Sequence, residues 1–94
     1  MPRTALVTGG TRGIGAAIAV ALKQAGYQVA ANYAGNEETA KRFTDETGIP
    51  AYKWDVGDHE ATNEGCARVS QEVGPIAVLV NNAGITRDGT LVRM

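Results

Sequence analysis

The segment that most constrains the fold is residues 8–15, Thr-Gly-Gly-Thr-Arg-Gly-Ile-Gly, which separates an apolar run from an alanine-rich run. Residues 5–7 are typical of a buried strand, and a helical repeat follows until Gly26. The residues of that repeat are Ile14, Ala17, Ile18, Ala21, Leu22 and Ala25. A glycine-rich turn between a strand and a helix presents unpaired N–H groups and the positive end of the helix dipole to an anion. The segment therefore predicts a pyrophosphate site, although an ordinary strand-to-helix turn also uses glycines.

Strands and helices alternate along the chain, which indicates parallel strands joined by crossover helices. We expect strands at 4–8, 28–33, 51–55 and 77–81, and helices at 13–25, 37–47 and 59–73. N-cap and αL C-cap residues mark the helix ends: Asn36 and Asp58, and Gly26, Gly48 and Gly74. Right-handed crossovers give the strand order 3-2-1-4, with a crevice at the switch point. The fold class is α/β, the N-terminal part of a doubly wound parallel-sheet (Rossmann) fold, in one domain spanning 1–94.

Composition removes several classes of function. Nine Lys and Arg residues balance ten Asp and Glu residues, and no basic cluster could follow a nucleic-acid backbone. There is no signal-peptide pattern and no apolar run long enough to cross a bilayer, so we expect a cytoplasmic protein with no membrane partner. The single Cys66 can form neither an internal disulfide nor a cysteine metal site, and no metal is expected.

The end of the second predicted strand bears on the choice of cofactor. In folds of this kind an acid at that position accepts a hydrogen bond from the 2′-hydroxyl of NAD. Residues 32–36 contain no acid, and the first carboxylate is that of Glu37. A carboxylate would repel the 2′-phosphate of NADP, whereas Arg12 places a positive charge in the glycine-rich segment 8–15, the glycine loop. The charges favour NADP(H), with a solvated Arg12 as the alternative interpretation.

Two further strand ends carry groups that suit a nucleotide. Asp55 and Val56 close the third strand, where a carboxylate and a backbone N–H could bind the adenine edge. Asp55 could equally begin the turn into the next helix. The fourth strand ends in Asn-Asn-Ala-Gly at 81–84, where small residues allow a flat ring to approach the backbone.

Together, segments 8–15, 55–56 and 81–84 resemble the N-terminal half of the short-chain dehydrogenase/reductase family over the whole chain. The continuation at 82–88, Asn-Ala-Gly-Ile-Thr-Arg-Asp, is similar to that of bacterial reductases of 3-oxoacyl thioesters. Residues 33–36 and 52–56 look more like the members that use acyl-CoA. The resemblance implies NADPH-dependent reduction of acetoacetyl-CoA to 3-hydroxybutyryl-CoA for polyhydroxybutyrate synthesis. The alternatives are a 3-oxoacyl-[acyl-carrier-protein] substrate in fatty-acid synthesis, and a non-catalytic NADP(H)-binding module.

The resemblance also implies a role for individual residues. Those expected around the pyrophosphate and 2′-phosphate are Gly9, Thr11, Arg12, Gly13 and Ile14. Those expected beside the adenosine ribose are Asn32, Tyr33 and Asn36, with Asp55 and Val56 at adenine. Those expected along the nicotinamide-side ribose are Asn82, Ala83, Gly84, Ile85 and Thr86. Asp88 is expected where the thioester docks, although Asp-Gly is also an ordinary turn.

The catalytic pair of the family, Tyr-x-x-x-Lys, does not occur in these residues. Tyr27, Tyr33 and Tyr52 are followed four positions later by Ala31, Glu37 and Val56. No catalytic residue is therefore assigned, and we expect the 94-residue chain alone to be inactive. The apolar strand at 77–80 is expected to form an exposed edge, typical of a piece of a longer chain. The family resemblance implies a homo-oligomeric parent, a tetramer.

Replacing Arg12 with Glu should put a like charge beside the 2′-phosphate. We expect NADPH binding to weaken by about 1 to 3 kcal/mol, with little change for NADH. Titrations with each cofactor test this. Equal losses for the two would show that Arg12 supports the loop rather than binding the phosphate.

Overall fold

The computed structural model describes residues 3–11, 13–82 and 90–93. Its strands are β1 (Thr4–Thr8), β2 (Gln28–Tyr33), β3 (Ala51–Lys53), β4 (Ile76–Asn81) and β5 (Thr90–Arg93). Its helices are α1 (Gly13–Gln24), α2 (Glu37–Thr47) and α3 (His59–Glu72). The sheet order is β3-β2-β1-β4-β5, and the first four strands are parallel. The predicted α/β class and the order 3-2-1-4 are thus confirmed.

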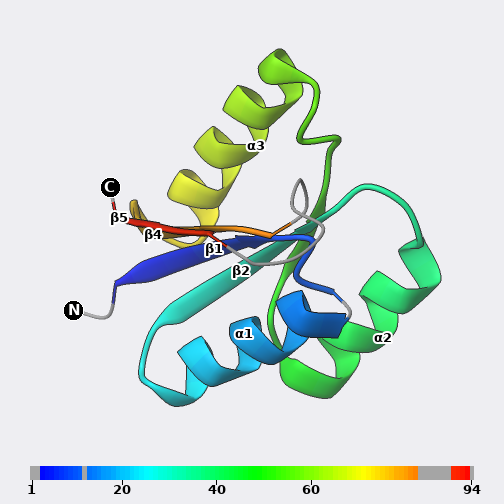
Figure 1. Ribbon diagram of the computed structural model, residues 1–94, viewed down its shortest axis with the longest axis vertical. Coiled ribbons are helices and arrows are strands. Elements are labelled where there is room, and N and C mark those ends of the chain that lie inside the picture. Colours follow the sequence, from blue (N-terminus) through cyan, green and yellow to red (C-terminus); the bar gives the residue numbers. More distant parts are fainter. Residues whose placement is uncertain (1–2, 12, 83–89, 94) are drawn as a thin grey trace.

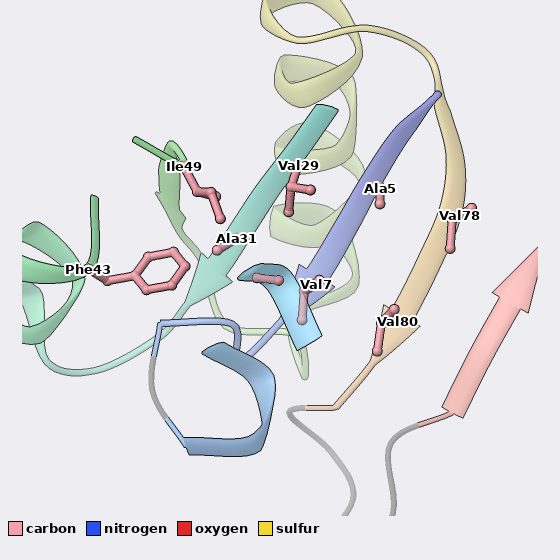
Figure 2. Packing of buried hydrophobic residues seen from close by; sticks show 9 residues of the cluster. Ala5, Val7, Val29, Ala31, Phe43, Ile49, Val78 and Val80 are labelled. Atoms are coloured by element: carbon pink, nitrogen blue, oxygen red, sulfur yellow. The ribbon is translucent and has the colours of Figure 1, made fainter. Parts of the chain in front are cut away.

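The sheet is covered on both faces, which explains why its strands are continuous apolar runs. Helices α1 and α2 lie on one face and α3 lies on the other (Figure 1). Alternate residues of β1, β2 and β4 point toward α1, and Phe43 and Ile49 join them (Figure 2). The intervening residues Leu6 and Ala30 pack with Trp54 and Val69 on the α3 face.

The local signals at the ends of α2 and α3 are largely confirmed. Asn36 Oδ1 accepts the N–H of Thr39 at 2.9 Å, and Asp58 caps α3 in the same way. Gly48 ends α2 in the left-handed conformation at φ 75°. The expected αL cap at Gly74 is wrong, because Val73 caps α3 with right-handed angles and Gly74 adopts φ 152°.

The face that α1 packs against the sheet differs from the predicted stripe. Gly15 and Ala19 are buried and Ile18 and Leu22 are half-buried, whereas Ile14 is 64% exposed. The other exposed members of the stripe are Ala17, Ala21 and Ala25. In an alanine-rich helix the same spacing fits more than one face, and methyl groups add too little hydrophobic area to decide between them.

The expected exposed edge at β4 is also wrong. Strand β5 pairs antiparallel with β4, from Asn81 opposite Thr90 to Val78 opposite Arg93. The four residues of β5, Thr-Leu-Val-Arg, neither alternate strictly between polar and apolar nor form a continuous apolar run, so no strand pattern marks them. Among the described residues, every helix is too short or too polar to cross a lipid bilayer.

Helix α3 sits on the sheet through the indole of Trp54. The ring is 7% exposed and lies against Gly65, where a Cβ would stand 2.4 Å from Trp54 Cε3. Only a hydrogen atom at position 65 permits this approach.

Gly65→Ala should therefore force α3 away from Trp54 and destabilise the fold by about 1–3 kcal/mol. Chemical unfolding of the full-length protein that carries this sequence measures the loss. Gly35→Ala is the matched control, because a Cβ at position 35 meets nothing within 4 Å. Equal stability of the two variants would contradict the close packing.

Candidate functional site

A cleft of about 460 Å³ opens at the carboxyl edge of the sheet. The described residues that line it are Gly9, Thr11, Gly13, Tyr33, Ala34, Gly35, Asn36, Thr39 and Asn82. The fold thus brings together residues from the exits of β1, β2 and β4. Six of the nine carry a predicted role. Ala34, Gly35 and Thr39 do not, although Thr39 could have been found as the residue whose N–H the N-cap Asn36 binds.

The glycine loop has a conformation that side chains would prevent. Gly9 and Gly13 adopt φ 63° and 60°, the left-handed region that favours glycine. A Cβ on Gly15 would stand 2.1 Å from the carbonyl oxygen of Gly9 and 2.8 Å from Asn82 Nδ2. The first turn of α1 therefore packs directly on the loop backbone, with its free N–H groups at the cleft.

Side chains from β1 and from the residue after β4 fix this loop. The Thr8 hydroxyl donates to the carbonyl of Val80 at 3.3 Å and accepts the N–H of Asn82 at 2.9 Å. Asn82 Nδ2 in turn donates to the carbonyl of Gly9 at 3.4 Å. The carboxyl ends of β1 and β4 are thereby joined by side-chain hydrogen bonds as well as by the backbone pairing of the two strands.

Asn32 lies behind the loop instead of along the cleft. It is 1% exposed, and its Oδ1 accepts the N–H of Gly9 at 3.4 Å while its Nδ2 donates to the carbonyl of Trp54 at 2.9 Å. Its backbone carbonyl accepts the N–H of Gly10 at 3.1 Å. Both ends of the side chain are used internally, in contrast to the expected place beside the ribose.

Tyr33 and Asn36 line the cleft, and the first acid after them is paired with a lysine. Glu37 forms an ion pair with Lys53 of β3, although both side chains are exposed. The hydrogen bond and the charge of Lys53 hold the pKa of Glu37 below its ordinary value. The same contacts raise the pKa of Lys53. The carboxylate is thus partnered on the β3 side, and no acid is among the described residues that line the cleft.

Asp55 begins the turn that leads into α3. Its carboxylate accepts the N–H of Gly57 at 2.8 Å, and its carbonyl accepts the N–H of Asp58 at 2.9 Å. Val56 lines a second hollow of about 350 Å³ on the α3 side. The described residues that line this hollow with Val56 are Leu6, Thr8, Trp54, Gly57, Thr62, Cys66, Leu79 and Asn81.

Part of the predicted site lies outside the described residues, namely Arg12, Ala83, Gly84, Ile85, Thr86 and Asp88. Ile14 follows Gly13 in the first turn of α1 and is exposed, but it is not among the residues that line the cleft.

The sequence pattern of the short chain dehydrogenase family matches residues 3–94. An acetoacetyl-CoA reductase of Rhizobium meliloti is 65% identical over the whole chain, which covers 39% of that protein. A 3-oxoacyl-[acyl-carrier-protein] reductase of Staphylococcus aureus is 43% identical over the whole chain, which covers 40% of it. A blue fluorescent protein from a metagenomic library, solved in complex with NADPH, superposes with TM-score 0.80 at 36% identity. That alignment covers 88% of this chain and 36% of the other.

Gly15→Ala should displace the glycine loop, because neither the Gly9 carbonyl nor Asn82 can move without breaking the contacts described above. We expect the affinity for a dinucleotide to fall at least about tenfold. Isothermal titration of the full-length protein measures this. Ala17→Ser, on the exposed side of the same helix, is the control, and unchanged affinity in Gly15→Ala would show that the loop tolerates a shift.

Proposed function

This chain belongs to the short chain dehydrogenase family, and we propose that it is the NADP(H)-binding part of a reductase of 3-oxoacyl thioesters. The observation that carries this proposal is the 65% identity to an acetoacetyl-CoA reductase across all 94 residues. The chain spans about two fifths of the length of that relative. The activity, substrate and assembly of the whole protein are therefore proposals.

The described residues fit a dinucleotide phosphate. A cleft backed by positive-φ glycines and by the amino end of α1 suits a pyrophosphate. We assign the pyrophosphate to Gly9, Thr11 and Gly13, and the adenosine ribose to Tyr33 and Asn36. Val56 and Asp55 are assigned to adenine, and Val56 is among the residues that line the second hollow.

Charge supports the phosphorylated cofactor. The described lining of the cleft contains no carboxylate, and the nearest acid in sequence, Glu37, is paired with Lys53. An anionic 2′-phosphate therefore meets no carboxylate among the described residues that line the cleft, and Arg12 is assigned to it by the family resemblance. The NADPH bound to a structural relative supports the same choice.

NADPH, when bound, supplies the hydride that reduces a 3-keto group. The proton must come from a group whose pKa lies near the working pH. Tyr52 does not suit this task, because burial and its hydrogen bond to Glu72 raise the pKa of its hydroxyl to about 12. We assign the proton donor to a Tyr-x-x-x-Lys pair outside these 94 residues.

The proposed substrate is acetoacetyl-CoA, reduced to 3-hydroxybutyryl-CoA for polyhydroxybutyrate synthesis. Identity is higher to the acetoacetyl-CoA reductase, 65%, than to the acyl-carrier-protein enzyme, 43%. Residues 83–86 are assigned to the nicotinamide side and Asp88 to the docking of the thioester. A cytoplasmic homo-oligomer, a tetramer by family resemblance, completes the proposal.

Steady-state assays of the full-length protein that carries this sequence test the function. We expect NADPH-dependent reduction of acetoacetyl-CoA, a lower kcat/KM with NADH, and a lower kcat/KM with acetoacetyl-acyl-carrier-protein. Preference for the carrier-protein substrate would favour the fatty-acid enzyme. NADPH binding without turnover of either thioester would favour a binding module, and preference for NADH would contradict the charge argument.

A further inference from the structure

The backbone N–H and carbonyl of Gly9 are both bonded to asparagines from other parts of the chain. Its N–H meets Oδ1 of Asn32 at 3.4 Å, and its carbonyl meets Nδ2 of Asn82 at 3.4 Å. Asn32 also holds the exit of β3, because its Nδ2 donates to the carbonyl of Trp54 at 2.9 Å. A single side chain on β2 thus joins the glycine loop to the segment that leads to Asp55.

Asn32 occupies a place where an apolar side chain would be expected. The three residues before it in β2, 29–31, are buried Val and Ala, and Asn32 itself is 1% exposed. A buried amide is tolerated only when its polar atoms are bonded, and removing one partner leaves the other unsatisfied. Both bonds of the Asn32 side chain can therefore form only when the backbone at Gly9 and the backbone at Trp54 lie at one particular distance from each other.

We propose that Asn32 is a positioning residue, whose buried amide sets the spacing between the glycine loop and the β3 exit and so orients Gly9 toward the dinucleotide. The proposal rests on the proposed function. It differs from a ribose contact, because Asn32 acts through the backbone of Gly9 and does not touch the cofactor. The pyrophosphate is common to NADPH and NADH, so the loss of Asn32 should affect both cofactors equally.

The test compares Asn32 variants with a core variant remote from the cleft, in the full-length protein. Asn32→Ala removes both bonds, and Asn32→Thr suits a strand but offers one hydroxyl that cannot span both partners. Truncation of Ile49, to Val or Ala, gives a control of matched melting temperature. Ile49 is 1% exposed and precedes β3 at the opposite edge of the sheet.

We expect the Asn32 variants to bind NADPH and NADH each about tenfold more weakly, well below their melting temperatures. The Ile49 variant should bind both within about twofold of the wild type. Losses no larger than those of the Ile49 control would overturn the proposal and leave Asn32 a purely structural residue. A loss confined to NADPH would also overturn it, in favour of direct contact on the 2′-phosphate side.

Amide hydrogen exchange without cofactor separates this proposal from the proposed function. Faster exchange at Gly9 and Gly10 in Asn32→Thr, but not in the Ile49 variant, is expected from the loss of the clamp. This readout remains valid if the wild type binds neither cofactor, an outcome that would defeat the proposed function alone. Unchanged exchange at both amides would overturn the positioning role even if binding fell.

Discussion

The cleft depends on the contact between the first turn of α1 and the backbone of Gly9. Since a Cβ at position 15 would stand 2.1 Å from the Gly9 carbonyl oxygen, the helix reaches the loop only because Gly15 has no side chain. That approach brings the free N–H groups of the helix to the carboxyl edge of the sheet. Gly9 and Gly13 have a different role, because their positive φ angles allow the chain to turn between β1 and α1.

The loop conformation is completed by residues that are remote in sequence. Asn32 accepts the N–H of Gly9, Asn82 donates to the Gly9 carbonyl, and the Thr8 hydroxyl accepts the N–H of Asn82. These contacts exist only when β2 and β4 are both in register with β1, with Thr8 opposite Asn32. Residues 8–15 therefore supply the glycines whose conformational freedom the loop requires, while the parallel sheet holds the residues that fix the loop conformation.

This division explains what could be read from the sequence. The N-caps Asn36 and Asp58 were predictable because their partners lie three residues away. The order 3-2-1-4 was predictable from right-handed crossovers together with the expectation that the chain crosses to the other side of β1 before β4. The packing face of α1 could not be predicted, because alanine spacing fits several faces of a helix. Strand β5 could not be predicted either, because its pairing with β4 leaves no local pattern in the sequence. Asn32 was expected beside the adenosine ribose. Its bond to the carbonyl of Trp54 depends on the path of the chain after β3, which no local signal records.

The charge of the cleft likewise depends on a pairing across the fold. An absence of acid at 32–36 is not sufficient, because Glu37 follows at once and a charge is felt over about 8 Å at physiological ionic strength. Lys53 of β3, sixteen residues after Glu37, supplies the opposite charge. The Glu37 side chain is 67% exposed and the Lys53 side chain is 52% exposed. An ion pair this exposed contributes little to stability. Its effect therefore lies in the local potential, where it offsets the charge of Glu37, one of the two carboxylates in the first turn of α2.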